Sequence, residues 1–338
     1  MQVCRLLKLV SLCALALGFA APAVAQPYPS RPVTMVVTNA PGGGADIIAR
    51  LLADAMKTQL GQAVIVTNRP GGQGTIGTAE VIAARPDGYT IALSAVATLT
   101  VQPHRQDLPY NTPDDYEPII KAANLPIMFS VHAKTPWKTM KEAFDFIRAN
   151  PGKIRVGSPG NGSMGHLTLA TLNTKAGTRF AHVPYLSGAE SIPSMLGGHV
   201  EALVVHPPEI LPHTAAGTAR VLATFEEKRN PSYPDAPTFR ELGYDVTLGV
   251  YYPLIGPKGL PKDIRDKLYQ AAKAALADPA FSAGVKARGY VLDTKEPEAF
   301  RQELWASYRA NAEILKYSPP NQTPHTPTIN CHPDAYNS

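Results

Sequence analysis

Hydrophobic residues follow two different spacings near the start of this chain, and the spacing changes close to residue 40. Residues 33–38 form a run rich in β-branched side chains, as expected of a buried strand. The run stops at Pro41 and three glycines, 42–44. Beyond them, apolar residues recur at helical spacing, at Ile47, Ile48, Leu51, Leu52, Ala55 and Met56. The pattern predicts a strand, a tight glycine loop and a helix.

The predicted glycine loop has the chemistry of an anion site, because it places backbone N–H groups at the start of a helix. Those groups have no partner within the helix and lie at the positive end of its dipole. Glycine has no Cβ, so a ligand can approach the backbone closely. An ordinary turn between a strand and a helix has the same pattern, and for this loop alone both interpretations stay open.

Strand and helix patterns alternate along most of the chain. Further strands are expected at 63–67, 89–94, 127–132, 154–156, 180–184, 202–206, 220–224 and 250–256. Helices are expected at 45–61, 75–84, 139–148, 164–175, 189–196, 209–216, 261–277, 279–288 and 297–316. Residues 108–118, rich in Pro and Asp, are expected to form a surface loop. The alternation favours an α/β fold with mixed, mostly parallel sheets flanked by helices.

A second glycine loop repeats the opening pattern later in the chain. Residues 157–163, Gly-Ser-Pro-Gly-Asn-Gly-Ser, follow the strand expected at 154–156 and precede the helix expected at 164–175. We therefore expect two α/β lobes, each with a glycine loop before a helix. About 310 residues are a natural size for two domains.

Both ends of the chain differ from this pattern. Arg5 and Lys8, the apolar stretch 9–20 and the triplet 23–25, Ala-Val-Ala, predict an export signal over 1–25, cleaved after Ala25. Residues 317–338 are rich in Pro, Asn and Thr and are expected to be disordered. Two of the three cysteines fall in the signal, so no internal disulfide is expected.

The charge balance argues against a nucleic-acid or membrane-surface partner. Without the signal, 30 basic residues face 27 acidic ones, so the formal net charge falls from +5 to +3. The basic residues are scattered singly, and aromatic residues make up 7% of the chain.

Two glycine motifs match a dinucleotide fingerprint but lack its acidic residue. They are Gly72-x-Gly74-x-x-Gly77 and Gly160-x-Gly162-x-x-Gly165, and neither following strand ends in Asp or Glu. A serine hydrolase is a weak alternative, because Asn161 breaks the G-x-S-x-G elbow around Ser163. No histidine spacing typical of a metal site occurs, so neither a metal nor a cofactor is expected.

His206 ends the apolar run 202–205, at the carboxyl edge of an expected strand. Open α/β sheets bind ligands at that edge, which makes His206 a candidate ligand contact. A histidine that merely packs at a strand end fits the same pattern.

Seven segments, taken in order, resemble one family, the periplasmic solute-binding proteins of tripartite tricarboxylate transporters (Bug-type receptors). The resemblance covers about residues 28–316. The segments are Asn-Ala-Pro-Gly-Gly-Gly-Ala-Asp at 39–46, Asn-Arg-Pro-Gly-Gly-Gln-Gly-Thr-Ile-Gly at 68–77, Arg-Pro-Asp-Gly-Tyr-Thr at 85–90, Gly-Asn-Gly-Ser at 160–163, His-Val-Pro-Tyr at 182–185, Leu-Gly-Gly-His-Val-Glu at 196–201 and Pro-Asp-Ala-Pro-Thr-Phe-Arg-Glu-Leu-Gly at 234–243.

The resemblance implies a two-lobe periplasmic-binding-protein clamshell, type II-like, that closes by a hinge motion over a small anion. Lobe 1 would comprise 26–124 plus 249–316, and lobe 2 would comprise 125–248. The resemblance also implies a monomeric, non-enzymatic protein of the periplasm that captures a carboxylate and delivers it to integral membrane permease subunits. A receptor that presents its liganded form to a sensor protein is an alternative.

In the family, loops of both lobes hold one ligand carboxylate. The matching positions here are Gly43, Gly44, Ala45, Ser158, Asn161, Gly162 and Ser163, with Ser94 and Thr98 as further expected contacts. Where this chain has Asn39, family members commonly have an aromatic residue, and where it has His206 they often have an acid. The resemblance therefore favours a dicarboxylate over an amino acid, because His206 removes a negative charge and donates to a second carboxylate. Terephthalate is the specific expectation.

Overall fold

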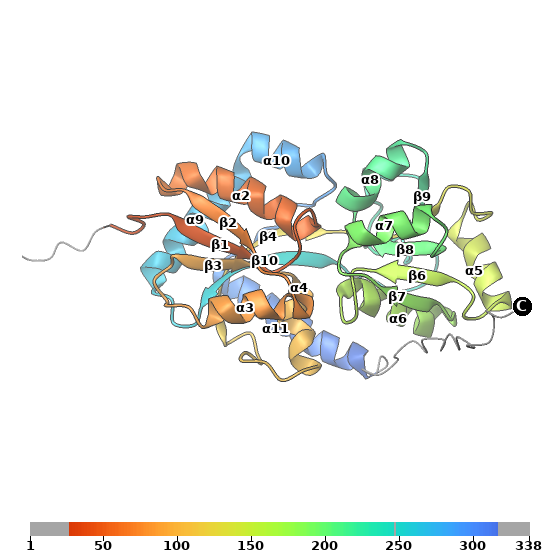
Figure 1. The fold of residues 1–338 in the computed structure, drawn as a ribbon, viewed down its shortest axis with the longest axis horizontal. Coiled ribbons are helices and arrows are strands. Elements are labelled where there is room, and N and C mark those ends of the chain that lie inside the picture. The colour runs from red at the N-terminus through yellow and green to blue at the C-terminus, as the bar shows by residue number, and fades with distance from the viewer. Residues whose placement is uncertain (1–26, 247, 317–338) are drawn as a thin grey trace, which may run out of the picture.

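The computed structural model describes residues 27–246 and 248–316 and contains two five-stranded sheets side by side (Figure 1). The first sheet has the strand order β2 (Val64–Asn68), β1 (Val33–Val37), β3 (Thr90–Leu93), β10 (Val250–Pro257) and β4 (Tyr116–Leu125). The second has the order β7 (Ala181–Pro184), β6 (Arg155–Ser158), β8 (Ala202–Val205), β5 (Met128–His132) and β9 (Ala219–Thr224). The expected two-lobe α/β architecture is confirmed.

Each sheet is mixed, with equal parallel and antiparallel character rather than mostly parallel. Strand β1 pairs in parallel with β2 and β3, whereas β10 runs antiparallel to β3 and β4. In the second sheet β6 pairs in parallel with β7 and β8, and β5 runs antiparallel to β8 and β9. The parallel half of each sheet is the half built by strand–helix alternation, because parallel neighbours need a crossover helix.

Helices flank both sheets. They are α2 (Gly44–Leu60), α3 (Thr75–Ile82), α4 (Val96–Thr100), α5 (Met140–Ala149), α6 (Met164–Ala176), α7 (Gly188–Leu196), α8 (Pro207–Ala215), α9 (Lys262–Ala277), α10 (Pro279–Lys286) and α11 (Pro297–Leu315). Two short 3₁₀ helices, η1 (Gly72–Gly74) and η2 (Gln102–His104), complete the described elements. The apolar face of α2 is buried, as its sequence spacing predicted, and includes Ile48, Leu52 and Met56.

Strand β4 was not predicted, and the loop expected at 108–118 is wrong over its last three residues. Pro118 and Lys121 interrupt the apolar pattern, so the sequence alone does not indicate a strand here. Pro118 is tolerated because β4 is an edge strand with an irregular register against β10. Lys121 is 2% exposed, and its charge is matched by Glu303 at 2.9 Å and by Asp293. The short elements α4 and η2 were also not predicted.

The chain passes between the two sheets twice, from β4 into β5 and from the segment after β9 into β10 (Figure 1). The lobe boundaries stay a prediction, although the strands of the two sheets divide near them. Leu125, placed in lobe 2 by the prediction, pairs with Val250 in the first sheet. The predicted signal and the predicted disordered tail lie outside the described residues.

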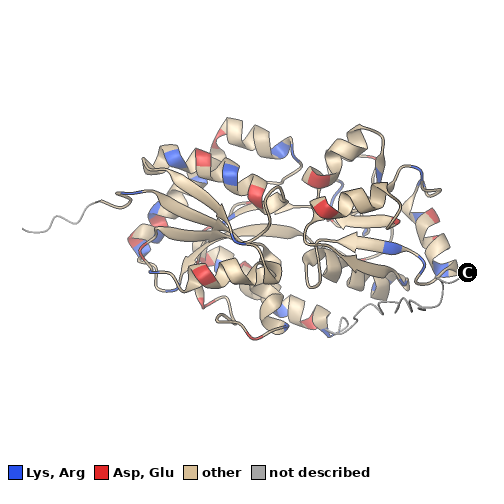
Figure 2. Ribbon diagram, in the orientation of Figure 1, with Lys and Arg blue, Asp and Glu red and all other residues tan. Residues whose placement is uncertain are grey.

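Positions of acidic and basic residues are interspersed along the helices of both lobes (Figure 2). Among residues 27–246 and 248–316, no helix combines the length and apolar character that a membrane crossing requires.

Candidate ligand-binding site

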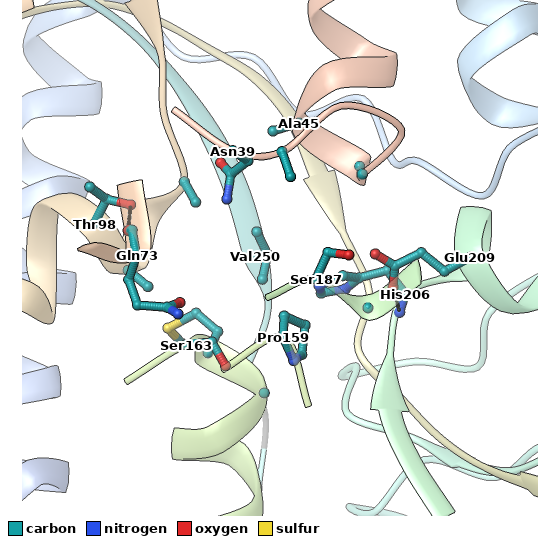
Figure 3. Close-up of a pocket in the computed structure, with 18 of the residues that line it drawn as sticks. Asn39, Ala45, Gln73, Thr98, Pro159, Ser163, Ser187, His206, Glu209 and Val250 are labelled. Atoms are coloured by element: carbon teal, nitrogen blue, oxygen red, sulfur yellow. Dashed lines mark hydrogen bonds between the residues drawn. The ribbon is translucent and has the colours of Figure 1, made fainter. Parts of the chain in front are cut away.

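A cavity of about 80 Å³ lies between the two sheets and is lined from both sides (Figure 3). One side of the cavity is lined by residues that precede β5 in the chain and by the returning strand β10. These residues are Asn39, Ala40, Gly43, Gly44, Ala45, Gln73, Ala95, Ala97, Thr98, Val250 and Tyr252. The second sheet and its helices contribute Pro159, Ser163, Met164, Gly165, Leu186, Ser187, Gly188, His206 and Glu209. No lysine or arginine is among these lining residues.

The N-terminus of α2 reaches this cavity without a side-chain cap. Its N-cap residue is Gly43, in an extended conformation, and among residues 27–246 and 248–316 no side chain accepts a hydrogen bond from the first helical N–H groups. The carboxylate of Asp46, in the first turn, bonds to neighbouring groups: Oδ2 accepts from Gly42 N and from Arg50 Nε, both at 3.0 Å. Burial alone would raise the pKa of Asp46, but these hydrogen bonds and one from Asn68 outweigh burial and lower it. The start of α2 therefore faces the cavity as a positive dipole end.

Gly44 allows two lobe-1 elements to approach the start of α2. A Cβ at this position would lie 2.6 Å from Tyr252 Oη and 2.8 Å from Leu125 Cδ2. Tyr290 Oη donates to Gly44 O at 2.7 Å, which further holds the loop against the sheet. Any side chain at residue 44 would therefore disturb packing as well as the cavity.

Helices α6 and α7 also begin at the cavity, and each has a serine as its N-cap. Ser163 Oγ accepts from His166 N at 3.2 Å, and Ser187 Oγ accepts from Glu190 N at 3.2 Å. Helices α4 and α8 begin there as well, with Ala95 and His206 as their N-cap residues, so with α2 five helix N-termini converge on one small cavity. That arrangement supplies positive potential without a cationic side chain.

His206 and Glu209 form the other polar wall of the cavity. His206 Nδ1 lies 2.9 Å from Pro126 O, and because a carbonyl only accepts, Nδ1 carries a hydrogen. In the neutral ring Nε2 is then an acceptor, so His206 donates to a ligand only when protonated. Glu209 Oε2 accepts from His206 N at 3.0 Å, and burial raises the pKa of Glu209. This finding differs from the expected role of His206, since an acid remains beside it and its donor is already used.

Seven predicted site residues line the cavity: Asn39, Gly43, Gly44, Ala45, Thr98, Ser163 and His206. Thr98 Oγ1 donates to Gln73 O at 2.8 Å, which ties η1 to α4. Ser94 does not line the cavity, because its buried Oγ is within 3.3 Å of Thr38 Oγ1 and 3.2 Å of Thr78 Oγ1.

Three more predicted residues lie beside the cavity rather than on it. Ser158 is buried, with Oγ 2.7 Å from His182 Nε2. Gly162 O accepts from Gln102 Nε2 at 3.2 Å, a hydrogen bond between the lobes. Asn161 lines a neighbouring hollow.

Sequence reasoning missed Gln73, Ser187, Glu209 and Tyr252 as cavity residues. Ser187 carried a usable signal, because Ser187-Gly-Ala-Glu190 has the S-x-x-E pattern of a helix start. Gln73 lies in the glycine-rich segment 71–74, where its φ of 58° places it in the left-handed region. Glu209 also carried a local signal, because it follows the predicted residue His206 by three positions and accepts from its backbone N–H. Nothing local marked Tyr252, which reaches the cavity through the packing of a distant strand.

The arrangement of serines and histidines does not form a hydrolase site. Ser163 caps a helix, and His166 Nδ1 accepts from Gly162 N at 3.0 Å rather than from a serine. His182 stacks on His166 at 4.3 Å, and burial followed by the nearby His166 lowers the pKa of His182 to about 3. No carboxylate contacts either ring within the described part of the chain, so no orienting acid is present.

Comparison with known proteins gives one consistent result. Residues 48–303 match the model of the tripartite tricarboxylate transporter family receptor. A UPF0065 protein from Cupriavidus necator is 38% identical over 312 residues, which cover 89% of this chain and 93% of the relative.

Two solved structures show the same fold. The periplasmic binding protein BugD has a TM-score of 0.80 and 32% identity, covering 86% of this chain and 98% of its own. The Rhodopseudomonas palustris protein Rpa4515, solved with adipate, has a TM-score of 0.81 and 26% identity, covering 86% and 98%. With a matching fold and family model, the chain belongs to the tripartite tricarboxylate transporter receptor family and is a solute-binding protein rather than an enzyme.

Proposed function

We propose that this protein is a periplasmic receptor that captures a small dicarboxylate and delivers it to the permease of a tripartite tricarboxylate transporter. The observation that carries the proposal is the uncapped N-terminus of α2, which faces a cavity without lysine or arginine. Backbone N–H groups there match one carboxylate by hydrogen bonds and helix dipole. Export with cleavage after Ala25 and function as a monomer belong to the same proposal.

The ligand class is proposed from the chemistry of both cavity walls. Asn39 places a polar amide where an apolar contact is common in the family, and the similar Rpa4515 was solved with adipate. A dicarboxylate such as adipate, or an aromatic one such as terephthalate, combines two anionic ends with a short apolar centre. The apolar centre would lie against Ala95, Ala97 and Val250.

The proposal is tested by thermal unfolding and calorimetry of the mature protein with aliphatic and aromatic mono- and dicarboxylates and amino acids. A ligand present at one hundred times its Kd stabilises the folded state by about 2.7 kcal/mol. We expect such a shift with a dicarboxylate and none with an amino acid. Absence of any shift across the carboxylates would contradict capture, and ligand uptake that survives deletion of the permease genes would contradict delivery.

A further inference from the structure

A second hollow, of about 720 Å³, adjoins the ligand cavity at the boundary between the lobes. The two spaces share Asn39, Ala40, Gln73 and Leu186 as lining residues. The hollow also takes in Arg105, which follows η2, and Asn161 from the facing lobe. The side chains of these shared residues are therefore what lies between the cavity and the hollow.

Arg105 brings an unmatched positive charge to the hollow. Within residues 27–246 and 248–316, its guanidinium makes no ion pair and no hydrogen bond, and its Nη1 atom is buried without a partner. Other cations in low-exposure positions are matched: Lys121 pairs with Glu303, and Arg265 pairs with Glu117 at 2.9 Å. A buried, unpaired guanidinium nitrogen is costly, and an anion bound in the hollow would supply the missing partner.

The position of Arg105 is well defined by its neighbours. Its backbone N donates to Gln102 O at 2.9 Å, and the Gln102 side chain bonds to Gly162 O of the facing lobe. A Cβ on Gly162 would lie 3.0 Å from Arg105 Nε, so the guanidinium rests against the second glycine loop. Arg105 is thus placed where the lobes meet.

The two ends of the combined space differ in their chemistry. At one end, His206 already commits Nδ1 to Pro126 O and lies beside the Glu209 carboxyl, an arrangement that disfavours a second anion. At the other end, Arg105 offers several N–H donors in a planar arrangement that fits a carboxylate. An anionic group extending from the α2 terminus is favoured only toward Arg105.

We propose that Arg105 binds the distal carboxylate of an elongated dicarboxylate whose first carboxylate lies at the N-terminus of α2. This inference rests on the proposed function and deepens it, since it assigns the second anion to a specific residue. It makes Arg105 a determinant of specificity for two-ended over one-ended ligands.

The test compares adipate with hexanoate, which has the same length but a single carboxylate. Calorimetry is run on the wild type, on Arg105→Gln and on Arg240→Gln, a control that removes an exposed positive charge with no side-chain partner among the described residues. We expect the wild type and R240Q to prefer adipate by about tenfold or more, the size of a charge-assisted hydrogen bond, and R105Q to lose that preference. Hexanoate binding should stay within about twofold in R105Q.

Stability and a conservative variant separate a ligand role from a structural one. Free R105Q should unfold no earlier than wild type, because an uncompensated charge is removed, and Arg105→Lys should recover part of the adipate preference. An R105Q variant that still prefers adipate as strongly as R240Q would overturn the Arg105 subsite and leave the proposed function standing. Failure of every variant to bind either compound or any other carboxylate would overturn both.

Discussion

At the scale of single residues, one polar wall of the cavity carries two ionisable side chains, His206 and Glu209. His206 uses Nδ1 to bond Pro126 O and keeps an acceptor nitrogen when neutral. Glu209 is buried beside it, and burial raises the pKa of its carboxyl. His206 was expected to remove a negative charge from this part of the cavity. The Glu209 carboxyl instead keeps an acid there, and its charge depends on pH.

Glu209→Gln should change the pH dependence of stability. Because the pKa of Glu209 is raised in the folded protein, the folded state holds a proton that the unfolded chain releases above pH 4.5, and stability is lost as the pH rises through this region. The variant cannot lose that proton, so its advantage over wild type in urea denaturation should grow from pH 4.5 to pH 7. Carboxylate affinity of the variant should also vary less with pH.

The matched control is Glu227→Gln, which removes an exposed carboxylate. Its stability should follow the wild-type curve over the same pH range, since an exposed acid has nearly the same environment in both states. Parallel curves for wild type and E209Q would show that the buried carboxyl does not titrate differently on folding.

At the scale of elements, five helix N-termini meet at the cavity and give it positive potential without a cationic side chain. Those of α6 and α7 are capped by Ser163 and Ser187, whereas α2 begins at Gly43 without a cap. An N-cap side chain satisfies the same N–H groups that a bound carboxylate would. The missing cap on α2 is therefore the feature that leaves donors for a ligand.

Gly43→Asp should stabilise the free protein and weaken carboxylate binding. The backbone of Gly43, with φ −78° and ψ 170°, already suits an N-cap aspartate. We expect a gain on the order of a few tenths of a kcal/mol in unfolding free energy. Carboxylate affinity should fall by about tenfold or more, because the new carboxylate occupies the donors and repels the ligand.

Gly43→Ala serves as the comparison, because it adds a methyl group without an acceptor. Its Cβ would lie 3.5 Å from Ala40 O, an ordinary contact. Calorimetry of the two variants should show a much larger loss for G43D. Equal losses would mean that space at residue 43, not the free helix terminus, controls binding.

At the scale of the whole molecule, the lobes contact each other next to the cavity through Gln102 and Gly162. This buried hydrogen bond forms only when the two lobes are close together. A clamshell that closes over its ligand would gain the bond on closing. The same contact places Arg105 beside the second glycine loop.

Gln102→Ala should weaken ligand binding by about fivefold, the value of one hydrogen bond of about 1 kcal/mol. The loss should appear as faster ligand dissociation, and small-angle X-ray scattering should show a smaller ligand-induced compaction than in wild type. Gln270→Ala, an exposed substitution on α9, should leave both unchanged. Unaltered dissociation from Q102A would argue that the contact does not hold the closed form.

The sequence by itself determined the features that depend on neighbouring residues. Strand–helix alternation, the two glycine loops and the helix at 44–60 follow from local spacing and from the conformational freedom of glycine. Seven of the predicted site residues lie together on the cavity because those loops end strands at the facing edges of two sheets.

Only the tertiary structure decided which other groups join them. Strand β4 contains the buried Lys121, and its partners Asp293 and Glu303 lie far along the chain. Ser94 and Ser158 turn inward to bond Thr38 and His182, while Tyr252 reaches the cavity from a distant strand. Arg105 lacks a partner among the described residues because of how the lobes pack. Such pairings depend on which surfaces pack together in the folded protein. The spacing of neighbouring residues in the sequence does not predict them.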